Sequence, residues 1–210
     1  MRTKTLLITA AIGAAAAVAT QAQVYSVNAV GYINLTINQG FNIVANQLDA
    51  GDNTVASLLA GVPGGTTVYT FDTAAGYTIN SYDADFEEWT DAAMELTPGM
   101  GFWVKAPSAI TVTLVGEVPQ GSLSLPLNAG FNLVSSIVPQ AGLVSTDLGM
   151  PVEGGDTVYT FDTAAGYSIF AYDADFEEWT PSEPSVAVGQ GFWVKSASTK
   201  SWDRNFSVND

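Results

Sequence analysis

Residues 68–90 read VYTFDTAAGYTINSYDADFEEWT, and residues 158–180 read VYTFDTAAGYSIFAYDADFEEWT. The second copy follows the first at a spacing of 90 residues, and 20 of the 23 aligned positions are identical. The three differences are Thr78/Ser168, Asn80/Phe170 and Ser81/Ala171. Repetition at a fixed period indicates a duplicated structural unit.

The same spacing relates the sequence on both sides of this stretch. Gly40–Val44 matches Gly130–Val134, and Gly101–Lys105 matches Gly191–Lys195. The identity is weaker between residues 30–67 and 120–157, where 12 of 38 positions agree. We therefore predict two tandem homologous modules, residues 23–119 and residues 120–210.

Each module is rich in short β-branched and aromatic runs separated by Gly, Asp and Asn, which is typical of strands joined by turns. Residues 54–60 differ, because their apolar side chains are three and four positions apart and follow Asp52 and Asn53, which predicts a short helical turn. We expect an all-β fold of two β-sandwich or barrel-like modules of about 90 residues, each with one such turn.

The first 22 residues have the layout of a secretory signal peptide. Arg2 and Lys4 precede an apolar, alanine-rich run from Leu6 to Ala19, and small residues follow at candidate cleavage sites. The run is shorter than the ~20 residues that a membrane-spanning helix needs, so we expect no membrane insertion. The predicted destination is the extracellular space, the cell surface or the periplasm.

The amino-acid composition restricts the partners that the chain can bind and the catalytic and metal sites that it can form. The chain has a net charge of −15, and loss of Arg2 and Lys4 leaves 4 basic against 21 acidic residues, a net charge of −17. Such a charge repels nucleic acid and anionic membranes, so neither is an expected partner. The chain has no His and no Cys, which excludes Ser-His-Asp and Cys-His catalysis, His-ligated metals and disulfides.

The densest acidic cluster lies in the repeated stretch and offers hard oxygen ligands of the kind that calcium accepts. The candidate ligands are Asp83, Asp85 and Glu87, with their counterparts Asp173, Asp175 and Glu177. The alternative is a solvated hairpin turn in which Asp bonds its own backbone. Calcium is the one cofactor that the sequence suggests.

Recurring aromatic residues are the second candidate site, since flat rings beside polar groups are what sugar rings stack on. The candidates are Trp89, Trp103, Trp179, Trp193, Tyr82 and Tyr172. If Phe102 and Val104 face the core, strand alternation leaves Trp103 near the surface. Trp89 and Trp179 lie beside the acidic turns, so we expect them to be exposed. The alternative is that most of these rings pack inside the modules.

Five segments together resemble a group of uncharacterised secreted proteins of verrucomicrobial bacteria. They read VYSVNAVG (24–31), GFNIVAN (40–46), VYTFD (68–72), GMGFWV (99–104) and RNFSVN (204–209). More loosely, the order GFN-x-V, VY-x-FD, G-x-GFWV resembles a module of bacterial exported proteins. The resemblance implies export and an all-β module, and it carries no catalytic residues.

These observations predict a secreted, non-enzymatic structural or interaction protein of the cell surface or extracellular matrix. Its partners would be other surface proteins or further copies of itself. The alternative is a carbohydrate-binding protein that uses exposed Trp and Tyr side chains on a polysaccharide. A glycoside hydrolase acting through paired carboxylates is the less favoured reading, because neighbouring strand residues such as Glu87 and Glu88 point apart.

Overall fold

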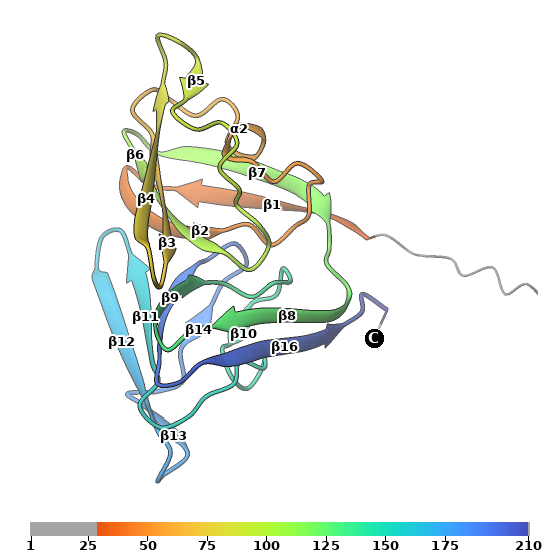
Figure 1. The fold of residues 1–210 in the computed structure, drawn as a ribbon, viewed down its shortest axis with the longest axis vertical. Helices are drawn as coiled ribbons and strands as arrows, with labels where there is room; N and C mark the ends of the chain where they lie inside the picture. The colour runs from red at the N-terminus through yellow and green to blue at the C-terminus, as the bar shows by residue number, and fades with distance from the viewer. Residues whose placement is uncertain (1–28, 210) are drawn as a thin grey trace, which may run out of the picture.

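A computed structural model describes residues 29–209, so the expected signal peptide lies outside the described residues. The described part consists mainly of antiparallel strands in two similar halves, one above the other in Figure 1. The expected all-β fold of two modules is confirmed. No helix in residues 29–209 is long and apolar enough to span a membrane.

The first module has a two-stranded sheet and a five-stranded sheet, both antiparallel. The two-stranded sheet is β1 (Val30–Ile37) with β7 (Ile110–Glu117). The order of the other sheet is β2 (Gly40–Ala45), β6 (Gly101–Ala106), β3 (Thr67–Asp72), β4 (Gly76–Asp83) and β5 (Glu88–Trp89). The short helix α2 (Val55–Leu58) lies between β2 and β3 along the chain.

The second module repeats this topology. The two-stranded sheet is β8 (Gly121–Leu127) with β16 (Lys200–Phe206). The order of the five-stranded sheet is β9 (Gly130–Val134), β15 (Phe192–Ser196), β11 (Thr157–Asp162), β12 (Gly166–Asp173) and β13 (Glu178–Thr180). A further pair, β10 (Gly142–Leu143) with β14 (Ser185–Val186), is present in this module.

Within the described residues, the second module has no assigned α-helix at the place equivalent to α2, but it keeps a single turn with the i to i−4 hydrogen bonding of a helix, from Asp147 N to the Leu143 carbonyl and from Gly149 N to the Ser145 carbonyl. In α2 the cap is Thr54, not Asp52 or Asn53, and its side chain accepts a hydrogen bond from the Ser57 N–H. The equivalent residue 90 positions later is Val144, whose side chain has no oxygen to cap a helix.

Each module is a sandwich with its own core. Along β1, Ile33, Leu35 and Ile37 are buried while the alternate residues are exposed, so one face of the β1–β7 pair packs on the five-stranded sheet. Val68 and Phe102 meet them from that sheet. Burying each such side chain contributes about 1.5–3 kcal/mol, which makes these alternating positions the main source of module stability.

The opposite faces of the two five-stranded sheets pack on each other. Ile43 and Trp103 of the first module form one buried cluster with Leu133 and Trp193 of the second. Ile43 and Leu133 are 90 positions apart, as are Trp103 and Trp193, so each module contributes the equivalent positions to the cluster. The contact therefore has an approximate two-fold symmetry, as in an isologous dimer interface.

Hydrogen bonds across the junction repeat the same symmetry. Thr73 Oγ1 donates to the Phe131 carbonyl at 2.8 Å, and Thr163 Oγ1 donates to the Phe41 carbonyl at 2.9 Å. Backbone bonds add a second reciprocal set, because Ala45 N donates to Gly189 O at 2.8 Å and Ser135 N donates to Gly99 O at 2.9 Å. The turn between β3 and β4 is thus bonded to β9 of the second module, and the turn between β11 and β12 is bonded to β2 of the first.

The repeated glycines Gly101 and Gly191 lie where the two backbones approach each other. A Cβ atom at Gly101 would be 2.8 Å from the Val134 carbonyl oxygen, and one at Gly191 would be 2.7 Å from the Val44 carbonyl oxygen. Carbon atoms do not approach backbone oxygen this closely, so a side chain at either position would push the modules apart. The junction explains why both copies carry glycine here.

An ion pair found in the second module alone provides a test of the packing. Asp156 is fully buried and pairs with Lys200, whereas the equivalent residues of the first module are Thr66 and Ile110. We expect Lys200→Ile to lower the free energy of unfolding by about 3–5 kcal/mol, because it leaves a buried carboxylate without its cation. Urea denaturation measures the loss.

The matched control copies the first module at both positions. Asp156→Thr combined with Lys200→Ile removes the buried charge together with its partner, so it recovers most of the stability lost in the single variant. A single variant as stable as the unmodified chain, or a double variant no better than the single one, would contradict this account.

Candidate functional site

The junction leaves part of each sheet face uncovered, and aromatic side chains gather there. In the first module the cross-strand pairs Phe71 with Tyr77 and Tyr69 with Ile79 lie on this face, because residues two apart on a strand point the same way. Tyr69 is also opposite Trp103 of β6. The register of the strands therefore places aromatic rings from three strands side by side.

Two grooves result, one for each module; the first includes one residue from the other module, and the second includes two. The first groove has a volume of about 410 Å³ and is lined by Phe41, Tyr69, Tyr77, Ile79, Trp103 and Phe161. The second groove has a volume of about 400 Å³ and is lined by Phe71, Tyr77, Phe131, Tyr159, Tyr167, Ile169 and Trp193. These volumes are within the range of small-ligand sites.

Edge-to-face aromatic contacts hold the floor of both grooves. The ring centroids of Phe71 in the first module and Trp193 in the second are 4.8 Å apart, and the angle between the ring planes is 77°. Phe161 lies 4.8 Å from Trp103, at 70°. Such contacts contribute about 0.5–1.5 kcal/mol each beyond the burial of area, so the groove floor and the module junction are one packed unit.

Tyr77 lines both grooves, and its counterpart Tyr167 lines the second groove beside it. The Tyr77 ring contacts Phe71 at 5.1 Å and Trp193 at 6.2 Å, and the Tyr167 ring makes the equivalent contacts at 5.1 and 6.3 Å. Both nevertheless remain about half exposed, at 55% and 51%. The grooves therefore form one continuous aromatic surface across the approximate two-fold axis.

The protonation of both tyrosines reflects this apolar setting. Partial burial among rings disfavours the charged phenolate and raises the pKa of Tyr77, while the Trp103 side chain, which hydrogen-bonds to it, opposes the shift. Burial likewise raises the pKa of Tyr167, and the neighbouring Tyr77 adds to the effect. Both side chains are therefore neutral hydroxyls at physiological pH.

The lining determines what the grooves can do chemically. They present aromatic and aliphatic faces with tyrosine hydroxyls, and neither lining includes Asp or Glu. Lys105 lies beside a groove residue, with its Nζ 5.5 Å from the centre of the Phe41 ring. Lys195 pairs across the strands with Phe131 in the second groove, and it is also exposed. The site therefore suits stacking on an apolar or flat group with an anionic neighbour.

The sequence-predicted aromatic residues divide into two groups. Trp103 and Trp193 line the grooves, but they are only 8% and 6% exposed, so the expectation that Trp103 lies near the surface is wrong. The reason is that the other module covers that sheet face. Phe102 and Val104 face the core as expected.

The expected exposure of Trp89 and Trp179 is also wrong. Both rings are buried in the cores of their own modules and pack against Tyr82 and Tyr172, each pair 5.4 Å apart. The strand that follows each acidic turn pairs back onto the sheet, opposite Tyr82 in the first module, which turns the indole inwards. Neither pair belongs to the groove linings.

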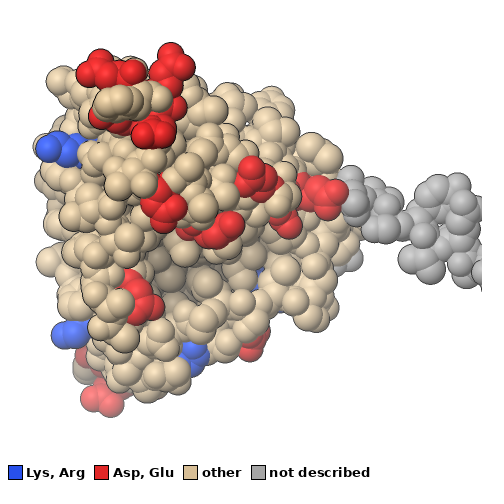
Figure 2. Space-filling model, turned by 45° about the horizontal axis from the view of Figure 1, so that its top comes forward, with Lys and Arg blue, Asp and Glu red and all other residues tan. Residues whose placement is uncertain are grey.

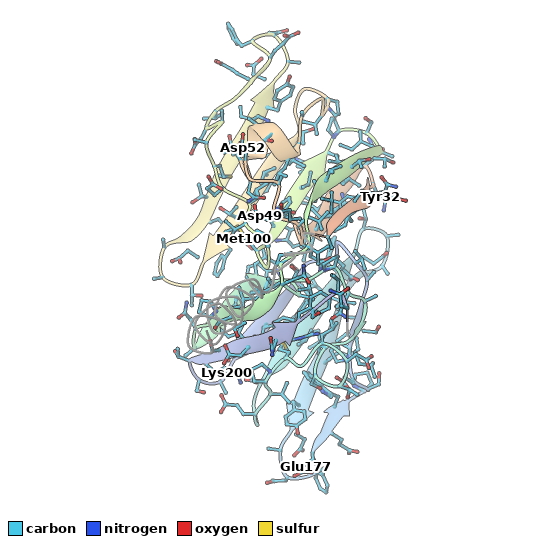
Figure 3. The ribbon with its side chains drawn as sticks, turned by 90° about the vertical axis from the view of Figure 1, so that its right-hand side faces the viewer. Tyr32, Asp49, Asp52, Met100, Glu177 and Lys200 are labelled. Carbon is cyan, nitrogen blue, oxygen red and sulfur yellow. The ribbon has the colours of Figure 1, made fainter. Side chains whose placement is uncertain are left out.

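The acidic turns lie at the far ends of the molecule. Acidic side chains gather at the top in Figure 2, and Glu177 marks the opposite end in Figure 3. The Asp83 carboxylate accepts hydrogen bonds from the N–H groups of Asp85 and Phe86, at 2.9 and 3.4 Å, as expected of a hairpin turn that bonds its own backbone.

The candidate calcium ligands are not brought into one cluster. Within the described residues, no group of three or more Asp, Glu, His or Cys side chains is placed to hold a metal ion. Asp83, Asp85 and Glu87 are exposed, as are Asp173, Asp175 and Glu177. Calcium binding at these turns stays a prediction.

Sequence analysis missed most of the groove residues. Phe41, Phe71 and Ile79, with their counterparts 90 positions later, line the grooves but were not among the candidate ligands. The pattern that could have identified them is strand alternation, because every second residue of a strand lies on the same face of the sheet. Alternation alone does not say which part of that face the second module covers.

The difference between buried and exposed aromatics at one end of the molecule is testable. We expect Trp89→Ala to lower the free energy of unfolding by about 3–5 kcal/mol, because it opens a cavity in the core. Phe86→Ser is the matched control, since that side chain is 75% exposed and its loss should change stability by about 0.5 kcal/mol or less. Equal effects of the two substitutions in urea denaturation would contradict the burial described.

The raised pKa values of Tyr77 and Tyr167 predict a pH effect. Above pH ~10 the unfolded chain loses these protons before the folded chain does, so folding stability falls as pH rises towards the folded pKa values. We expect the variant Tyr77→Phe/Tyr167→Phe to lose less stability over this range. Denaturation measured at several alkaline pH values tests this, and an unchanged slope would refute it.

The chain was compared with protein-family models, curated proteins and solved structures, and none of these matches it. The resemblance to verrucomicrobial secreted proteins stays a prediction. Function is therefore inferred from the grooves, from the hairpin turns at residues 83–88 and 173–178, and from the charge of the chain.

Proposed function

We propose that this chain is a non-enzymatic interaction protein that acts outside the cytoplasm and binds its partner through the paired aromatic grooves. The observation that carries the proposal is the continuous aromatic surface around Tyr77 and Tyr167. Its residues come from both modules and are held in place by the same contacts that join the modules.

Exposure of the groove residues supports a binding role. Ile79 and Ile169 are 59% and 56% exposed, next to half-exposed tyrosines. Soluble proteins rarely leave large apolar groups together on the surface unless the patch binds something. In a chain with more than three times as many acidic as basic residues, such a patch is a further departure from the rest of the surface.

The signal-peptide pattern supports export. Arg2 and Lys4 before an alanine-rich apolar run are typical of secretion, and a net charge far from zero favours solubility. Within a cell-surface or matrix setting, two equivalent grooves would bind a repeated or bivalent partner more strongly than one groove would.

Polysaccharide binding is the second candidate, and the groove lining favours it over hydrolysis. Tyr77 and Tyr167 supply half-exposed rings on which a sugar can stack, and their hydroxyls can bond sugar oxygens. The linings contain no carboxylate pair of the kind that glycoside hydrolases use.

The test uses two variants of the chain without its signal peptide. Ile79→Glu/Ile169→Glu places a charge in both grooves at exposed positions, so folding should be preserved. Tyr32→Glu is the control, because Tyr32 is 73% exposed on the outer face of the β1–β7 pair, outside the grooves. The probes are the amphiphilic, anionic dye anilinonaphthalene sulfonate and a panel of insoluble polysaccharides, with calcium and with chelator.

We expect the groove variant to bind the dye at least about tenfold more weakly than the control does, because the bound dye would cover the new carboxylates and remove their water, and because like charges repel the sulfonate. Retention on a polysaccharide that is lost in the groove variant would select the second candidate, and loss with chelator would implicate the acidic turns. Equal dye binding by the groove variant and the unmodified chain would refute a binding role for the grooves.

A further inference from the structure

Each module carries one phenylalanine that the fold leaves almost entirely exposed. Phe86 and Phe176 are 75% and 74% exposed, the highest values among the large apolar side chains of residues 29–209. They lie in the turns between β4 and β5 and between β12 and β13, residues 83–88 and 173–178, which we call the tips. The tips project from opposite ends of the molecule (Figure 1).

The backbone that carries these rings has the same defined conformation in both tips. Asp83 accepts hydrogen bonds from the backbone of the first tip, and Asp173 accepts one from Asp175 N at 2.9 Å in the second. Glu87 and Glu177 have positive φ angles of 55° and 53°, which side-chain-bearing residues seldom adopt. The same backbone in both modules presents a phenylalanine among exposed carboxylates.

The grooves have the complementary chemistry. Their aromatic linings can enclose a phenyl ring, and the exposed cations Lys105 and Lys195 lie beside their outer phenylalanines. The other two basic residues of the described part bond within the chain, because Lys200 pairs with Asp156 and Arg204 donates to the Leu148 carbonyl at 2.5 Å. Within residues 29–209, the two exposed lysines therefore both lie next to a phenylalanine that lines a groove.

We infer that the occupant of the groove is the tip of a second copy of this chain. Phe86 or Phe176 enters the aromatic groove, and the tip carboxylates face Lys105 or Lys195. This inference rests on the proposed function of the grooves and names their partner. Rings stacking on rings and opposite charges at the rim are the two features that a specific contact needs.

The geometry predicts growth beyond a dimer. A tip and a groove are different surfaces, so the contact is heterologous and does not have to close on itself. Each copy has two tips at its ends and two grooves at its middle, which leaves free tips and grooves after the first contact. Matrix-like assembly follows from a single kind of contact.

The identity between the modules fits this pairing. Residues 68–90 and 158–180 contain both the tips and the β3–β4 or β11–β12 strands that line the grooves. A contact between a tip and a groove constrains the sequence of both surfaces, and it does so in both modules. Segments outside this stretch, such as residues 30–67, diverge further from their counterparts.

The experiment measures the mass of the chain without its signal peptide across a concentration series by sedimentation velocity. The tip variant is Phe86→Ser/Phe176→Ser, the groove variant is Ile79→Glu/Ile169→Glu, and Tyr32→Glu is the control. All five positions are more than half exposed, so the variants should fold. We expect the unmodified chain and the control to associate, and each double variant alone to remain monomeric.

The decisive step is mixing the two monomeric variants. The tip variant retains grooves and the groove variant retains tips, so the mixture should associate again. Lys105→Glu/Lys195→Glu, which alters the charge without changing the lining, should weaken association by about tenfold or more, since like charges across a contact are unfavourable.

Three results would overturn the inference: an unmodified chain that stays monomeric, a tip variant that associates normally, or a mixture that does not associate. These results are distinct from failure of the proposed function. A tip variant that never affects association, together with groove-dependent binding of dye or polysaccharide, would leave the grooves functional and assign them another occupant.

Discussion

The aromatic contact between the modules is the interaction on which the rest of the structure depends. Trp103 and Trp193 each pack against a phenylalanine of the other module, and both indoles are buried as a result. Each five-stranded sheet therefore has its own core on one face and the other module on the opposite face. The grooves are the part of that second face that the contact leaves open, so the position of the site follows from the packing of the modules.

This arrangement explains an unusual pattern of identity. In an ordinary sandwich one face of a strand packs in the core and the other faces water, so core packing constrains alternate residues. Here Val68 packs in the module core while its neighbour Tyr69 packs at the junction. Side chains on both faces of these strands are therefore constrained by packing, which accounts for the unbroken identity between β3 and β11. The tips lie outside the junction, so their identity needs a separate explanation, and contact between copies supplies one.

Much of the fold could be predicted from the sequence, whereas of the groove linings only Trp103 and Trp193 were among the predicted site residues. The 90-residue period and the alternation of Phe102 with its neighbours identified two all-β modules and their cores. Trp103 was misplaced because its cover comes from residues far away in the chain, which no local pattern records. Trp89 was misplaced because its proximity to acidic residues suggested exposure, whereas pairing opposite Tyr82 turns it inwards. The exposure of Ile79 beside the junction depends on how the modules meet.

The pairing of the first and last strands within each module has a consequence for the history of the chain. β1 pairs with β7 and β8 pairs with β16 along their full lengths, so a module begins and ends on adjacent strands. Only residues 118–120 separate one closed unit from the next. A unit whose ends are neighbours can be copied in frame without disturbing its interior. The two halves of this chain have the arrangement that copying such a unit produces, and the contact between them has the symmetry of an isologous dimer within one chain.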